Sequence, residues 1–133
     1  MVPVYNEEEC IGQVIDSWLA TLDALKIDYL LLVLDDGSRD GTRDVLRTYV
    51  CNPRVEIVAK DNSGHGPTIL TGYRRAVRRS EWVFQCDGDG EMPAAAFEKL
   101  WHLRRTHEAV FGMRTGRSSA WDRALVSFVS RCL

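Results

Sequence analysis

The chain has 133 residues, with 17 Lys and Arg against 19 Asp and Glu, which gives a formal net charge of −2 at pH 7. This length suits one domain, and so small a net charge argues against a nucleic-acid-binding protein, which normally carries a clustered basic surplus. Hydrophobic residues make up 45% and charged residues 27%, so the chain can bury a core and is not disordered. The longest apolar run, 29–34, is far below the ~20 residues that cross a bilayer.

Short β-like runs alternate with amphipathic helical patterns along the whole chain. We predict strands at 1–4, 28–34, 55–59, 82–86 and 109–113, and helices at 7–25, 40–50, 66–79, 93–105 and 118–133. Asn6 is the predicted N-cap of the first helix. This alternation predicts an α/β domain with a mainly parallel sheet. The chain starts at a strand end and stops inside a helical pattern, so we expect the domain to be incomplete at both ends.

Polar clusters follow four of the predicted strands. They are Tyr5-Asn6-Glu7, Asp35-Asp36, Asp87-Gly88-Asp89 and Arg114. The carboxyl ends of parallel strands meet at one edge of a sheet, and ligands of such sheets bind there. The sequence therefore predicts one site that is built from four separate segments.

Asp87 and Asp89 are spaced to share one hard cation at a tight turn, with Glu91 two residues further on. Mg²⁺ or Mn²⁺ typically takes one or two such carboxylates and completes its shell with substrate phosphate oxygens. The alternative is a polar turn that caps the next helix. A calcium-binding EF-hand loop does not fit, because Met92 stands where that loop needs Gly.

Two further loops have polar patterns. Asp35 and Asp36 can accept hydrogen bonds from a base or a ribose, while Asp40 suits a structural cap before a helix. The loop 62–68 has glycines before a helix, which can cradle phosphate, but it lacks the lysine of a P-loop. His65 in this loop is interpreted as a surface histidine.

Several motifs in order resemble glycosyltransferase family 2, and most closely its polyprenyl-phosphate (dolichol-phosphate) sugar transferases. They are residues 2–8 (VPVYNEE), 34–42 (LDDGSRDGT), 64–66 (GHG) with 72–74 (GYR), 87–93 (DGDGEMP) and 112–114 (GMR). The resemblance implies a GT-A fold, a Rossmann-like three-layer sandwich, in which residues 1–133 form the part that binds the nucleotide-sugar. The acceptor side would then lie in a C-terminal portion that is absent.

The resemblance also implies roles for single residues. Pro3, Tyr5, Glu7 and Asp36 fall where the family holds the nucleoside of the donor. Asp87 and Asp89 match its metal motif, with Glu91 also near the metal, and Asp87 contributes to donor binding. Arg114 matches an arginine that contacts phosphate, and Arg123 one near the acceptor phosphate, so Asp89, Arg114 and Arg123 form the expected catalytic set.

The function that this resemblance implies is inverting transfer of a sugar from a UDP- or GDP-sugar to a polyprenyl phosphate lipid, with Mg²⁺ or Mn²⁺. Transfer to a sugar hydroxyl, or an inactive nucleotide-binding module, stays open as an alternative. We expect a cytoplasmic protein that works at the cytoplasmic face of a membrane, since the cysteines have no zinc spacing and there is no signal-peptide pattern. The last predicted helix has an apolar stripe for peripheral membrane contact: Trp121, Leu125, Phe128 and Cys132.

Overall fold

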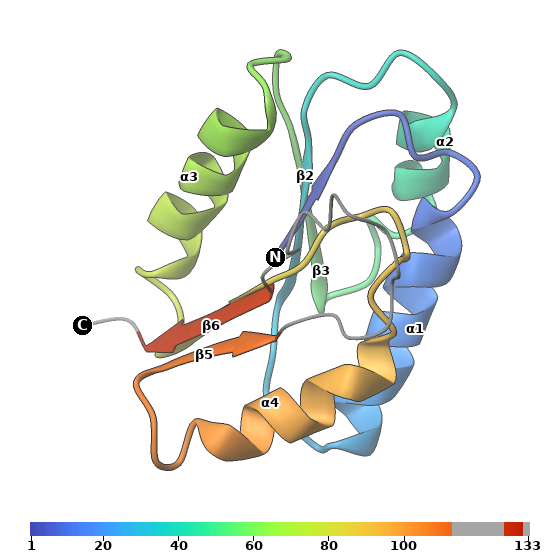
Figure 1. Cartoon of the computed structure of the whole chain (residues 1–133). Helices are drawn as coiled ribbons and strands as arrows, with labels where there is room; N and C mark the ends of the chain where they lie inside the picture. The colour runs from blue at the N-terminus through green and yellow to red at the C-terminus, as the bar shows by residue number, and fades with distance from the viewer. Residues whose placement is uncertain (113–126, 132–133) are drawn as a thin grey trace, which may run out of the picture.

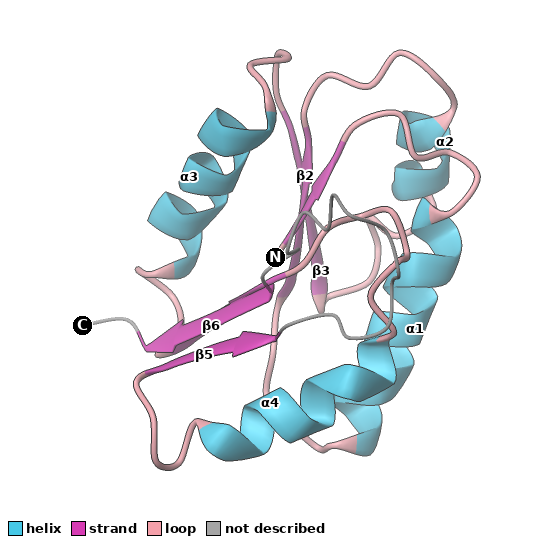
Figure 2. Ribbon diagram, viewed as in Figure 1, coloured by secondary structure: helices cyan, strands magenta, loops and turns pink. Residues whose placement is uncertain are grey.

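The structure is a computed structural model that describes residues 1–112 and the strand at 127–131. Its elements in chain order are β1 (Val2–Val4), α1 (Ile11–Ala24), β2 (Leu31–Asp35), α2 (Thr42–Arg47), β3 (Val55–Ala59), α3 (His65–Ala76), β4 (Trp82–Gln85), the 3-10 turn η1 (Ala94–Ala96), α4 (Phe97–Leu103), β5 (Ala109–Gly112) and β6 (Ser127–Arg131). The predicted alternation of strands and helices is confirmed as far as β5 (Figure 2).

The strands form two sheets that meet at the start of the chain. β1, β2 and β3 pair in parallel in the order β1-β2-β3, and β4, β6 and β5 pair antiparallel in the order β4-β6-β5. The Met1 nitrogen donates to the Phe84 carbonyl at 2.5 Å, and the Cys86 N–H donates to the Met1 carbonyl at 3.2 Å. These two bonds follow the parallel pattern, so the residue before β1 connects the two sheets at the end of β4.

Helices cover both faces of the parallel strands (Figure 1). Side chains alternate across the sheet: Val2, Val4 and Val33 belong to the core beneath α1, whereas Leu32 and Leu34 pack with α3. Figure 1 shows α3 on one side of these strands and α1 and α2 on the other. The three-layer α/β sandwich predicted from the sequence is confirmed.

The apolar stripe predicted for the first helix is buried as expected, but the helix starts later than predicted. Ile11, Ile15 and Trp18 of α1 are all buried. Asn6 is not its N-cap, because α1 begins at Ile11 after Cys10. Asn6 instead has a positive φ of 55° and uses its side-chain oxygen to hold the next loop. Tertiary contacts of this loop therefore replace the predicted cap.

The predicted last helix is wrong over Ser127–Arg131, which forms β6 between β4 and β5. Phe128 lies opposite Gln85 on one side and Phe111 on the other. A short apolar run is compatible with a helix or a strand. Here backbone hydrogen bonds to two neighbouring strands stabilise the strand. The other stripe residues, Trp121, Leu125 and Cys132, lie outside the described residues. No helix in the described part of the chain is long and apolar enough to cross a membrane.

Candidate functional site

A pocket of about 440 Å³ lies at the carboxyl ends of β1, β2 and β4. It brings together six of the predicted site residues: Pro3, Tyr5, Glu7, Asp36, Asp87 and Asp89. It is completed by residues of the β3–α3 loop and of α3: Asn62, Gly64, His65 and Thr68. The convergence predicted from the sequence is therefore confirmed for three strand ends, and a fourth segment joins them.

The loop after β1 is held by the loop after β2. The Asn6 N–H donates to the Ser38 hydroxyl at 3.0 Å, and the Arg39 N–H donates to the Asn6 side-chain oxygen at 2.8 Å. The Glu7 N–H donates to the Thr42 hydroxyl at 2.8 Å. Three hydrogen bonds between segments more than 30 residues apart thus fix the backbone that carries Tyr5 and Glu7 into the pocket.

Asp40 extends the same connection between the two loops. One carboxylate oxygen accepts the N–H of Thr42 at 3.1 Å, and the other accepts the N–H of Glu8 at 3.2 Å. In return, the Glu8 carboxylate accepts the Gly41 N–H at 2.5 Å. Asp40 is therefore structural, as predicted, but it is not the N-cap of α2, which is Gly41. Its carboxylate instead connects the start of α2 to the opposite loop.

Asp36 is buried at the end of β2, with only 4% of the residue exposed. Its Oδ1 accepts the Ser63 N–H at 2.9 Å and also contacts the Lys60 ammonium, and its Oδ2 accepts the Gly64 N–H at 2.9 Å. Burial alone would raise the pKa of Asp36, but these hydrogen bonds outweigh burial and lower the pKa to about 2. The carboxylate is thus charged and organises the loop that forms one wall of the pocket.

Lys60 does not line the pocket but contacts Asp36, which does, and sequence reasoning missed it. Besides Asp36, three oxygens lie within hydrogen-bond distance of its ammonium: the Asp61 carbonyl and the Ser63 hydroxyl, both at 2.7 Å, and the Thr68 hydroxyl at 3.2 Å. Its three N–H donors are thus shared among four acceptors. Lys60 thereby connects the end of β2, the β3–α3 loop and α3. A single lysine after a strand has no distinctive pattern, so only its position in the fold reveals this role.

Acid titration checks the Asp36 network. Because the pKa of Asp36 is about 2 in the folded protein, below the ordinary aspartate value of 3.8, this carboxylate stabilises the fold fully only above about pH 4. We expect that contribution to be lost as the pH falls from about 4 to 2, and the Asp36 carboxyl carbon to titrate in NMR near pH 2. An Asp36 signal that titrates near pH 4 in the folded protein would contradict the network.

Asp35 does not reach the pocket, although the sequence placed it with Asp36 in nucleotide binding. Its fully buried carboxylate accepts the Arg43 Nε–H at 2.7 Å and the Ser38 N–H at 2.9 Å. It lines a separate hollow between α2 and β3. Successive residues of a strand point to opposite faces, so of two adjacent aspartates only Asp36 lines this pocket.

Asp87 and Asp89 form the opposite wall of the pocket. Gly88 between them packs against β1, where a Cβ would come within 3.0 Å of the Pro3 carbonyl oxygen. Burial raises the pKa of Asp87, the nearby His65 lowers it, and the charge of Asp89 raises it further. A half-buried carboxylate beside a second carboxylate is a position that favours a bound cation.

The two carboxylates fit Mg²⁺ or Mn²⁺ in their chemistry, since both ions prefer oxygen ligands. Within the described residues, no three His, Cys, Asp or Glu side chains gather closely enough to hold a metal by themselves. Glu91 is exposed and does not line the pocket, and its N–H donates to the Asp89 carboxylate at 2.9 Å. Asp87 and Asp89 are therefore suited to a cation that takes its remaining oxygens from a phosphorylated ligand.

His65 is more than the surface histidine predicted from the sequence. Its side chain is 62% exposed, yet it lines the pocket, and its Nε2 lies 3.6 Å from an Asp87 oxygen. The first residue of α3 thus faces the end of β4 across the pocket. The separation of 22 positions in sequence explains why the pairing had no local signal.

Cys10 lies between the β1 loop and the Asp87–Asp89 turn. Its thiol sulfur is 3.2 Å from a Glu7 carboxylate oxygen and 3.5 Å from the Gly88 carbonyl oxygen. Burial, followed by the hydrogen bond to Glu7, raises the pKa of Cys10 to about 11. At neutral pH the thiol therefore keeps its proton and donates it within the site.

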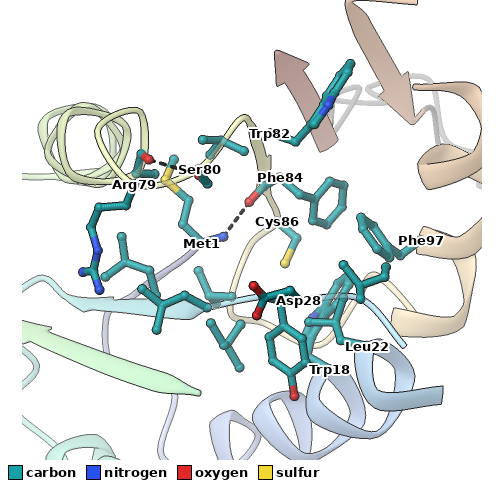
Figure 3. Close-up of a pocket in the computed structure, with 18 of the residues that line it drawn as sticks. Met1, Trp18, Leu22, Asp28, Arg79, Ser80, Trp82, Phe84, Cys86 and Phe97 are labelled. Carbon is teal, nitrogen blue, oxygen red and sulfur yellow. Dashed lines mark hydrogen bonds between the residues drawn. The ribbon is translucent and has the colours of Figure 1, made fainter. Parts of the chain in front are cut away.

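Two members of the predicted catalytic set, Arg114 and Arg123, lie outside the described residues. A second cavity, of about 300 Å³, lies where β2 and β4 begin, at the opposite ends of these strands (Figure 3). Figure 3 shows mainly aromatic and aliphatic side chains around it, including Trp18, Phe84 and Phe97. It contains none of the predicted site residues.

Comparisons with curated proteins find transferases. The undecaprenyl-phosphate 4-deoxy-4-formamido-L-arabinose transferase of Shewanella sediminis is 26% identical over 136 aligned positions, which cover 100% of this chain and 40% of the relative. The uncharacterized glycosyltransferase YkcC of Bacillus subtilis is 32% identical over 119 positions, covering 88% of this chain and 36% of the relative. The chain thus spans about 40% of the length of the first relative.

Solved structures show the same fold. S. aureus TarS 1-349 in complex with UDP-GlcNAc matches with a TM-score of 0.72 at 20% identity, over 98% of this chain and 44% of that one. The mannosyltransferase PcManGT from Pyrobaculum calidifontis, in complex with GDP-Man and Mn²⁺, matches with a TM-score of 0.69 at 23% identity, over 96% and 42%. The fold is accordingly that of GT-A glycosyltransferases. The family model for glycosyl transferase family 2 matches residues 1–127, so this chain belongs to that family.

Proposed function

We propose that this chain is the donor-binding part of an inverting, metal-dependent glycosyltransferase that transfers a sugar from a nucleotide-sugar to a polyprenyl phosphate. The observation that carries the proposal is the pocket itself. In it, a wall made by Asp36 and the β3–α3 loop faces a pair of carboxylates, Asp87 and Asp89. A nucleoside on the first wall would direct its diphosphate toward the second.

The two walls would bind different parts of the donor. Tyr5, Glu7 and Asp36 would hold the nucleoside, and Asp87 and Asp89 would hold Mg²⁺ or Mn²⁺ against the diphosphate. The bound ion would supply Lewis-acid stabilisation of the negative charge on the leaving group. The complex of the fold neighbour PcManGT with GDP-Man and Mn²⁺ supports this choice of ion.

The acceptor is proposed from the curated relatives, whose names specify undecaprenyl phosphate. An oxygen of the lipid phosphate would form the new bond to the anomeric carbon, while the bond to the donor's β-phosphate oxygen breaks and its electron pair leaves with the nucleoside diphosphate. Attack from the face opposite the leaving group inverts the configuration. A phosphate oxygen is already ionised at pH 7, so the step requires no strong general base.

This acceptor implies the setting in which the reaction occurs. A lipid phosphate is met at a membrane surface, and the donor is expected at the cytoplasmic face. We therefore propose that the enzyme works at that face. Because Ser127–Arg131 forms the strand β6 and not an amphipathic helix, we propose that other residues contact the membrane. Arg114 and Arg123 are the proposed partners of the acceptor phosphate, since guanidinium groups bind phosphate through charge-assisted hydrogen bonds.

A transfer assay tests the proposal. The full-length protein is incubated with labelled UDP- or GDP-sugars and Mn²⁺, with undecaprenyl phosphate in detergent micelles or a soluble oligosaccharide as acceptor. We expect label in the organic extract, as a product that mild acid hydrolyses, and none in the oligosaccharide. Label in the oligosaccharide alone would contradict the lipid acceptor but support glycosyltransferase activity. No transfer from any donor would contradict the proposed enzymatic activity.

A further inference from the structure

We propose that the nucleoside pocket selects a base with a single imino N–H, uracil or thymine, over guanine, and that Lys60 sets this preference through Asp36. This inference rests on the proposed function, because it names the donor class of the same site. It follows from counting which acceptor positions of Asp36 are already occupied.

An ionised carboxylate offers about four acceptor positions, two on each oxygen. On Oδ1 of Asp36, the Lys60 ammonium and the Ser63 N–H take both positions. On Oδ2, the Gly64 N–H takes one position at 2.9 Å. The Thr68 hydroxyl does not take the fourth position, because its single proton is donated to the Gly64 carbonyl at 2.9 Å. One position, on Oδ2, is therefore left for a ligand.

The burial of Asp36 also limits how a base can reach its carboxylate. The side chain of Asp36 is only 5% exposed, and the β3–α3 loop wraps around it through the Asn62 amide, which donates to the Asp36 carbonyl at 2.8 Å. A base in the pocket therefore approaches one edge of the carboxylate. It cannot engage both oxygens at once.

The bases differ in the donors that they present to such an edge. Uracil and thymine present one N–H between two carbonyl oxygens, which a single acceptor position satisfies. Guanine presents an imino N–H and an amino N–H side by side, which need two acceptors. One donor of guanine would remain unpaired in a desolvated site, and this typically weakens binding by about tenfold or more.

Calorimetry of nucleoside diphosphates tests the preference. With the parent protein at fixed Mn²⁺, we expect UDP and TDP to bind at least about tenfold more tightly than GDP. Equal or tighter binding of GDP would overturn the inference and leave the proposed transferase intact. If no nucleoside diphosphate binds, the proposed function fails, and the inference fails with it.

Substitutions of Lys60 test how the preference arises. Lys60→Met frees a position on Oδ1, so we expect the ratio of GDP to UDP dissociation constants to fall severalfold toward one. Lys60→Arg keeps a donor near Oδ1 and should keep the ratio, as should Lys99→Met on the exposed surface of α4. The ratio is measured on one sample, so partial unfolding does not change it. A Lys60→Met ratio equal to that of Lys99→Met would overturn the role of Lys60.

Discussion

Asp89→Asn is expected to abolish the gain in nucleoside diphosphate affinity that Mg²⁺ or Mn²⁺ provides, and to lower the transfer rate by at least about a hundredfold. Asp89 is exposed at the pocket wall, and its charge raises the pKa of Asp87. Its removal therefore takes away one anionic ligand and also relieves repulsion of the diphosphate. Without metal, the variant should bind the nucleotide as tightly as the parent or more tightly. With metal, it should bind the nucleotide less tightly than the parent.

Calorimetry with Mn²⁺ and with EDTA checks this result on one protein. The fold should persist, because the asparagine oxygen can still accept the Glu91 N–H that Asp89 accepts at 2.9 Å. Asp44→Asn, which removes an exposed carboxylate from α2, is the matched control and should leave the gain unchanged. If the parent binds nucleotide equally with Mn²⁺ and with EDTA, the metal assignment is wrong.

The sequence predicted the sheet edge well because strand ends are a local signal. Apolar runs followed by acidic turns marked the ends of β2 and β4, and parallel topology then required Asp36 and Asp87 to converge. The same reasoning could not separate Asp35 from Asp36. Which of two adjacent carboxylates faces the ligand depends on the register of β2 against its neighbours, and on Arg43, eight residues away.

The residues that the sequence analysis missed act through long-range contacts. Lys60 belongs to no motif, and His65 lies in a loop for which only phosphate binding by the backbone was suggested. Each acquires its role from a partner in another segment, Asp36 and Asp87 respectively. The strand β6 was missed for a related reason. Its pairing with β4 joins segments more than 40 positions apart, and such pairing overrides a weak helical period.

Gly37→Ala is expected to lower the free energy of unfolding by about 2–4 kcal/mol, which combines a backbone cost with a steric one. Gly37 has a positive φ of 75°, and a Cβ there would lie 2.7 Å from the backbone nitrogen of Asn62. A backbone atom cannot rotate away as a side chain can. The substitution would therefore push out the loop whose Ser63 and Gly64 N–H groups bind Asp36, and weaken nucleotide binding as well.

Another glycine measures backbone strain without a steric contact. Gly64 has a φ of 91° and a ψ of 164°, a region that is essentially restricted to glycine, and a Cβ on it would meet nothing within 4 Å, so Gly64→Ala should cost only the backbone strain, about 1–3 kcal/mol. Urea denaturation of the two variants measures both costs. If Gly37→Ala costs no more than about 1–2 kcal/mol, which backbone strain alone would explain, the close contact between the β2–α2 and β3–α3 loops does not form, and the wall that carries Asp36 is held in another way.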